Sequence, residues 1–173
     1  MKRTIFALTG AGLIALAGAA RAAPGPSDPQ IAHIAYTAGA IDVAAGKQAL
    51  VKTHNPKVRD FAQEMVRDHT AVNDKALALV KKLGVTPQPN PTSAGLQTQA
   101  TAERAKLAKL NGAAFDRAYA ANEVAYHKTV NGALEQTLIP SAQNGELKSL
   151  LQTGLKLFEE HQAHAEQLAR DLR

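Results

Sequence analysis

The sequence predicts an all-α protein, a four-helix bundle whose second and third helices are joined by a long helical crossover. Two observations lead to this prediction. Apolar residues recur at intervals of three and four along several long segments, the spacing that draws one apolar stripe down a helix. β-branched residues are sparse and nowhere alternate with polar residues over a useful length, so no strand is expected.

The first 22 residues have the composition of a secretory signal peptide. Lys2 and Arg3 precede an uncharged, largely apolar run, and Ala20-Arg21-Ala22 offers small residues for cleavage after Ala22. The run is shorter than the roughly 20 apolar residues of a membrane-spanning helix. We therefore expect a periplasmic or secreted protein without a stable membrane anchor after cleavage, in which residues 23–173 form one domain.

Charge and cysteine content exclude several classes of function. Cleavage would remove three of the 20 Lys and Arg residues and none of the 15 Asp and Glu residues, which lowers the formal net charge from +5 to +2. Basic and acidic residues alternate without forming a block, so no nucleic-acid partner is expected. The chain has no cysteine, which excludes disulfides, thiolate metal sites and a cysteine nucleophile. A protein partner or a homo-oligomer stays undetermined.

Local capping patterns set the limits of the first two helices. The dipeptides Asp28-Pro29 and Asn55-Pro56 each offer an N-cap side chain ahead of a proline at the first helical position. Both helices then carry apolar stripes. The second is expected to end just before Gly84, because glycine readily adopts the backbone conformation that closes a helix.

The segment from about residue 84 to residue 112 is predicted to be the crossover. Its first part, T-P-Q-P-N-P-T-S (residues 86–93), is too rich in proline for a helix interior. A helix over residues 94–110 with few large apolar side chains follows. At about 1.5 Å per residue it spans roughly 25 Å, enough to carry the chain from one end of a bundle to the other.

Two further long helices are expected, over residues 113–139 and 145–172. Pro140 is predicted to end the first, and Asn144 to cap the second. The last helix has a seven-residue seam typical of a bundle helix, and one place in that seam is a histidine. The seam consists of Leu147, Leu151, Gly154, Phe158, His161, Ala165, Leu168 and Leu172.

Polar residues from different helices are expected to meet at one level inside the bundle. If successive helices alternate in direction, the cap positions and the helical rise place five residues within roughly 6 Å along the bundle. They are Asp42, His69, Glu123, His127 and His161. Imidazole and carboxylate ligands suit iron, zinc, copper or manganese, and metal sites in bundles are built from facing helices. The candidate metal ligands are His69, His127, His161, Glu123, Asp42, Asp68 and Glu160.

Three segments behind the signal-peptide pattern carry a family resemblance. They read FAQEMVRDHTAVND (residues 61–74), AAFDRAYAANEVAYHKTV (residues 113–130) and LKLFEEHQAHAEQL (residues 155–168). Together they resemble the uncharacterised bacterial family catalogued as domain of unknown function 4142, and the resemblance covers nearly all of the mature chain. It implies an exported, ferritin-like bundle, and it implies no activity.

The resemblance also implies that His69, His127 and His161 face inward. The chain departs from the family pattern at Asp42, where the family often has glutamate, and at Lys128, where an acid is common. We expect both departures to weaken a charge-rich metal site.

Three classes of function stay open on the sequence. The first is a periplasmic ferritin-like protein that binds a transition metal, with stress tolerance suggested by family context. The second is a structural or interaction protein whose buried polar layer only fixes helix register. The third is a di-metal oxidase, which the spacing argues against because such centres use Glu-x-x-His motifs, whereas this chain has Glu123-x-x-x-His127 and Glu160-x-x-x-His164. We assign no catalytic residue.

Overall fold

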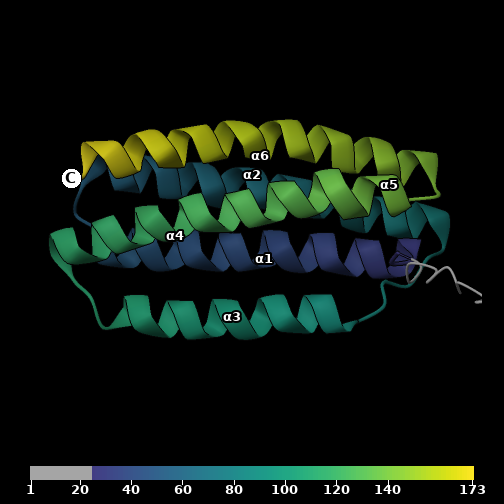
Figure 1. The fold of residues 1–173 in the computed structure, drawn as a ribbon, viewed down its shortest axis with the longest axis horizontal. Coiled ribbons are helices and arrows are strands. Elements are labelled where there is room, and N and C mark those ends of the chain that lie inside the picture. The colour runs from purple at the N-terminus through teal and green to yellow at the C-terminus, as the bar shows by residue number, and fades with distance from the viewer. Residues whose placement is uncertain (1–24) are drawn as a thin grey trace, which may run out of the picture.

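The computed structural model describes residues 25–173, and this part of the chain is all-helical, as predicted (Figure 1). The predicted signal peptide lies outside the described residues. A π-helical turn, η1 (Leu134–Leu138), and the short α5 (Ile139–Ser141) join the last two long helices. The long helices are α1 (Asp28–Lys52), α2 (Pro56–Leu83), α3 (Pro91–Ala108), α4 (Gly112–Ala133) and α6 (Gly145–Asp171).

Helices α1, α2, α4 and α6 form the bundle, and α3 lies outside it (Figure 1). The closest pairs are α1 with α2 and α4 with α6, and contacts between α2 and α6 join the two pairs. The crossover helix α3 packs mainly on α1 and buries only Ser93 and Leu107. It returns the chain from the end of α2 to the far end of the bundle, where α4 begins, so the predicted crossover is confirmed.

The start of α1 differs from the prediction. Ser27, not Asp28, is the N-cap residue, and its backbone N–H donates to the Gln30 side chain at 3.0 Å. The Asp28 carboxylate instead accepts the backbone N–H groups of Gln143, at 2.9 Å, and Asn144, at 2.8 Å. Asp28 therefore ties the first turn of α1 to the start of α6.

Three other predicted helix ends are confirmed. The side chains of Asn55 and Asn144 accept backbone N–H groups in the first turns of α2 and α6. Gly84 closes α2 with a φ of 63°, in the left-handed region that glycine adopts without steric cost. Local chemistry decides all three ends.

The connector before α3 is shorter than the predicted range 86–93. The side-chain oxygen of Asn90 accepts the Ser93 N–H at 3.1 Å, and the Ser93 hydroxyl oxygen accepts the Asn90 N–H at 3.2 Å. This reciprocal pair satisfies two free donors at the helix start. The helix therefore begins at Pro91 and covers Pro91–Ala108 rather than residues 94–110.

Pro140 does not end the preceding helix as predicted. The N–H of Ile139 bonds to the carbonyl of Leu134, five residues back, which makes the π turn η1. In a regular α-helix the proline ring clashes with the preceding turn and lacks an N–H to donate. The wider π turn accommodates Pro140, and the chain stays helical to Ser141.

Two apolar clusters fill the bundle on either side of a polar layer. One cluster includes Phe61, Met65 and Phe115, and the other includes Ile31 and Leu151. Along each bundle helix, the buried polar positions other than Asp116 fall between residues of these two clusters. The layer is therefore enclosed above and below by apolar side chains.

We expect Asp28→Ala to lower the free energy of unfolding by about 1 kcal/mol, because two N–H groups at the start of α6 lose their acceptor. Thermal unfolding followed by circular dichroism measures this, and in a domain of this size such a loss lowers Tm by about 2–4 °C. Asp74→Ala removes an exposed carboxylate from α2 and is the matched control. Equal shifts in both variants would contradict the role of Asp28.

Candidate metal centre

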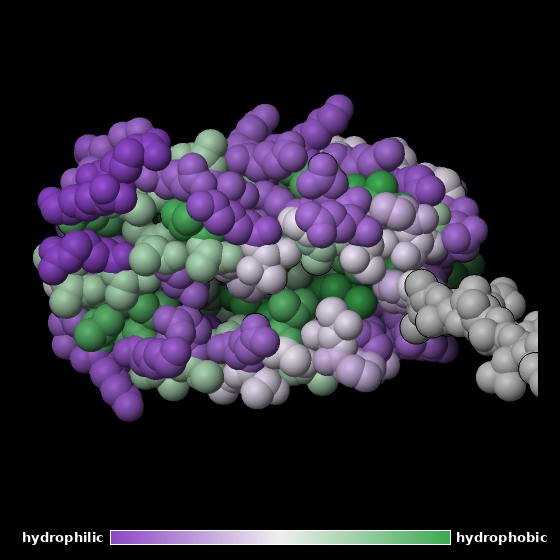
Figure 2. Space-filling view, in the orientation of Figure 1, coloured by the Kyte–Doolittle hydropathy of each residue, from purple (hydrophilic) through white to green (hydrophobic). Residues whose placement is uncertain are grey.

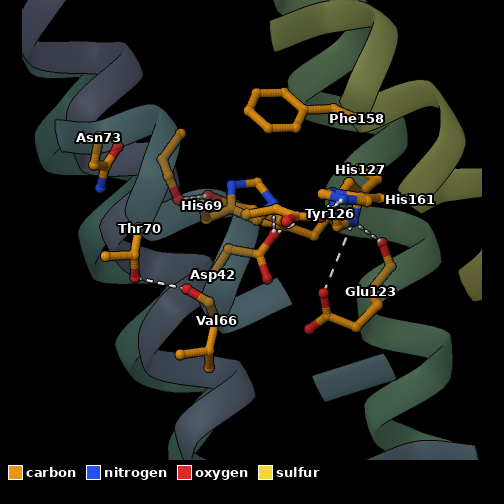
Figure 3. Close-up of polar contacts among 12 residues, drawn as sticks. Asp42, Val66, His69, Thr70, Asn73, Glu123, Tyr126, His127, Phe158 and His161 are labelled. Atoms are coloured by element: carbon orange, nitrogen blue, oxygen red, sulfur yellow. Dashed lines mark hydrogen bonds and ion pairs between the residues drawn. The ribbon is translucent and has the colours of Figure 1, made fainter. Parts of the chain in front are cut away.

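Five polar side chains from the four bundle helices meet between the apolar clusters (Figure 3). Asp42 comes from α1, His69 from α2, Glu123 and His127 from α4, and His161 from α6. None of them is more than 3% exposed. The structure therefore brings together the five residues that helix counting placed in one layer.

The three imidazole rings of this layer face one another. The ring centroids of His69 and His127 are 5.7 Å apart, those of His69 and His161 are 5.2 Å apart, and those of His127 and His161 are 5.6 Å apart. One nitrogen from each ring lies within 4.8 Å of the other two. Zinc–nitrogen bonds are about 2.0–2.1 Å long, so small side-chain movements would let one ion contact all three rings.

Two of these histidines have one ring nitrogen held in place and the other without a partner. The Nδ1–H of His127 donates to the carbonyl oxygen of Glu123 at 3.0 Å, and Nε2 has no hydrogen-bond partner among the described residues. His161 is arranged the other way, with Nε2 at 3.1 Å from the Asp68 carboxylate and Nδ1 without a partner there. Metal-binding histidines usually donate their second N–H to a carbonyl or carboxylate in this way.

Asp42 lies between two of the histidines. Its Oδ2 is 3.1 Å from Nε2 of His69 and 3.4 Å from Nε2 of His127, but neither contact has hydrogen-bond geometry. Within the described part of the chain, both oxygens of Asp42 and both ring nitrogens of His69 are buried without a hydrogen-bond partner. Buried polar atoms without partners are costly, and the Asp42 oxygens and one nitrogen of neutral His69 present lone pairs that suit a cation.

Burial and neighbouring charges set the protonation of the layer. Burial opposes ionisation of Asp42, but its favourable interaction with the neighbouring imidazoles of His69 and His127 outweighs burial and lowers the pKa of Asp42. Burial, together with the charge of Asp42, raises the pKa of Glu123 well above its usual range. Burial also lowers the pKa of His127 and of His161. His127 and His161 are thus kept in the neutral form that binds metals.

A second group of ionisable side chains lies outside the layer, between α2 and α6. His164 Nδ1 is 2.6 Å from the Glu64 carboxylate, and Arg67 binds both oxygens of Asp68, at 2.7 and 3.0 Å. Burial opposes ionisation of Asp68, but the hydrogen bonds from Arg67 and His161 lower its pKa. Asp68 is therefore an ionised partner that orients His161 from outside.

Glu64 and His164 were not among the ligands predicted from the sequence. The available indication was spacing, because Glu64 and Asp68 are four residues apart and His161 and His164 are three apart, so each pair shares a helix face. The exposure of His164 agrees with a rim position. What the spacing did not show is that the two faces meet.

Glu160 is the one candidate ligand that stands apart. Its side chain is exposed, and it belongs to none of the groups of converging donor atoms in the described residues. Consecutive residues on an α-helix point about 100° apart, so when His161 faces the layer, Glu160 faces away from it. The structure gives no support for Glu160 as a ligand.

A pocket of about 210 Å³ beneath α3 reaches the carboxylate side of the layer. Asp42 and Glu123 contribute to its wall, together with Glu103 and the exposed Arg104 of α3. A functional metal site needs an entry path as well as ligands. The pocket lies on the side from which an ion would approach the two carboxylates.

The fold and the layer define a class of protein, a helical bundle with a buried histidine–carboxylate cluster. The family described as a domain of unknown function (DUF4142) matches residues 14–168, and the chain belongs to this family. No curated protein matches the chain, and no solved structure does. In the described part of the chain, no helix is long and apolar enough to cross a membrane.

We expect Glu123→Gln to gain stability over the wild type as pH rises. Because the folded-state pKa of Glu123 is raised, its protonation stabilises the fold fully below the unfolded pKa of about 4.3, and this contribution is lost as pH rises through the folded pKa. Glutamine has no such proton to lose. The free energy of unfolding of Glu123→Gln therefore rises relative to that of the wild type, by at most about 1.4 kcal/mol per pH unit.

Urea unfolding of the metal-free proteins at about pH 5 and about pH 8 measures this difference in the free energy of unfolding. Glu135→Gln, at an exposed position of η1, controls for the removal of a carboxyl group. If the wild type and Glu123→Gln changed in parallel between the two pH values, the assigned protonation of Glu123 would be wrong.

Proposed function

We propose that this protein is an exported helical bundle that binds one transition-metal ion between His69, His127 and His161, with Asp42 as the fourth ligand. One observation carries the proposal: among the described residues, buried donor atoms without hydrogen-bond partners lie in one layer, where one nitrogen from each of three imidazoles converges and Asp42 lies beside His69 and His127. Three of these donors are imidazole nitrogens, and the fourth group is a carboxylate with a lowered pKa. Export rests on the sequence of the first 22 residues.

A purely structural layer explains the geometry less well. A polar layer that fixes helix register stabilises a protein when every member is hydrogen-bonded, and a half-satisfied network is worse than an apolar core. Here His127 and His161 are each held through one nitrogen while the other is left without a partner in the described residues. That arrangement fixes the direction of a lone pair, which a metal ligand needs and a structural layer does not.

The donor set indicates the kind of ion. Three imidazoles and a carboxylate suit zinc, iron, copper or manganese rather than magnesium or calcium, which prefer oxygen ligands. Glu123 lies beside Asp42 and retains its proton because burial and the charge of Asp42 raise its pKa. A cation entering the layer would lower that pKa and release the proton.

The layer gives little support to a di-metal oxidase. Di-iron centres of ferritin-like bundles use four glutamates together with two histidines. The buried layer has only two carboxylates, Asp42 and Glu123. A single ion matches this set of ligands better than a carboxylate-bridged pair.

The mature chain, purified from the periplasm without an affinity tag, should contain close to one equivalent of a transition metal by mass spectrometry of the digested protein. His127→Ala should lose nearly all of it, because a central ligand is removed. His54→Ala changes an exposed histidine and should keep the metal. A metal-free wild type whose His127→Ala variant only melts at a lower temperature would instead favour the structural role.

Asp68→Asn should weaken metal affinity without changing the stoichiometry. Loss of the ionised partner of His161 should raise the Kd by about 10–100-fold, as for other groups that orient metal ligands. Competition with a chromophoric chelator measures the change, and Asp74→Asn on the same helix is the control. Unchanged affinity would contradict the orienting role, and complete loss of the ion would show that Asp68 is itself a ligand.

A further inference from the structure

A second cavity, of about 520 Å³, lies in the half of the bundle that contains the starts of α1 and α6. All four bundle helices contribute to its wall, together with α3 and η1. Protein interiors are close-packed, with few voids larger than a water molecule. A volume of this size falls instead within the range of about 300–1,000 Å³ that is typical of small-molecule sites.

Small side chains create this space. Seven of the residues that line the cavity are alanine or glycine: Ala32, Ala35, Ala38, Gly39, Ala76, Ala133 and Gly154. The π turn η1 adds Leu134 and Leu138 to the wall, and π turns inside helices often mark functional sites. Figure 2 shows hydrophobic residues gathered along the middle of this face of the molecule.

The lining determines the chemistry of a ligand. None of the described residues that line the cavity carries a charge, and the polar ones are amides and hydroxyls. A charged ligand would be buried without a counter-charge, at high cost. The wall follows α6 from Leu147 to Phe158, which is about 16 Å at the helical rise, so the ligand is elongated as well as uncharged.

Neutral polar groups lie at one end of the cavity. Gln30 belongs to the first turn of α1, and Asn90 and Thr92 belong to the start of α3. The Asn90 side chain is already bonded to Ser93, Gln30 and Gln88, but the side-chain nitrogen of Gln30 and the hydroxyl of Thr92 can hydrogen-bond to a hydroxyl, ester or carbonyl group. They suit the polar end of a molecule whose remainder is hydrocarbon.

Phe158 closes the other end of the cavity. Its ring stacks on the imidazole of His69, with centroids 4.5 Å apart and planes 13° apart, and it also lines the cavity (Figure 3). One aromatic ring therefore separates the cavity from the histidine layer. The cavity is thus a separate site, and its lining includes none of the proposed metal ligands.

We infer that this cavity binds an uncharged, lipid-like molecule with a long hydrocarbon part and a neutral polar end. The inference rests on the volume, the elongated shape and the uncharged lining, and it holds whether or not the histidine layer binds a metal.

The test uses the mature protein, freed of metal with a chelator, and the neutral fluorescent probe N-phenyl-1-naphthylamine. We expect saturable binding of one probe per chain. Ala76→Phe should lower the affinity for the probe at least about tenfold, because the new ring fills the cavity. Ala78→Phe, at an exposed position two residues further along α2, is the control and should leave the affinity unchanged. Ala35→Phe fills the same space from α1 and replaces Ala76→Phe if that variant does not fold.

Three results would overturn the inference. They are the absence of saturable binding, equal binding of a sulfonated and therefore anionic analogue of the probe, and equal weakening by Ala76→Phe and Ala78→Phe in folded protein. Light scattering during the titration adds a fourth, because a doubling of mass would show that the apolar lining joins two copies of the chain instead.

Discussion

The structure depends on the placement of the Asp42 carboxylate between the imidazoles of His69 and His127. A carboxylate in an apolar interior is unstable unless neighbouring groups compensate its charge. The two contacts of 3.1 and 3.4 Å therefore require α1, α2 and α4 to keep a common register. His161 adds α6 to the same requirement, and the apolar core is divided into two clusters as a result. The polar layer therefore interrupts what would otherwise be one continuous apolar core.

The sequence predicted those parts of the fold that local chemistry decides. The caps at Asn55 and Asn144 and the stop at Gly84 involve residues within one helical turn, so a linear pattern is sufficient. Asp28 was misread because the N–H groups that it accepts belong to a segment more than a hundred residues further along the chain. Pro140 was misread because a π turn, which no residue pattern indicated, accommodates it. The ferritin-like relationship stays a prediction.

Depth along the bundle was predictable, but rotation about each helix axis was not. Counting residues from the helix ends placed Asp42 and the three histidines at one level because helices are nearly straight rods of known rise. Which nitrogen of His161 faces inward depends on how α6 turns against α2, and therefore on the contact with Asp68. The cavity was not predictable from the sequence either, because it results from small residues of four separate helices.

The weak anchoring of α3 has a consequence for how the protein opens. This helix buries only Ser93 and Leu107 and packs mainly on α1, whereas each bundle helix buries residues against at least two others. Local unfolding begins in elements with few buried contacts and needs less free energy than global unfolding. The amide hydrogens of α3 should therefore exchange with solvent before those of the four bundle helices. Because α3 forms part of the wall of both pockets, its detachment would expose them while the rest of the molecule stays folded.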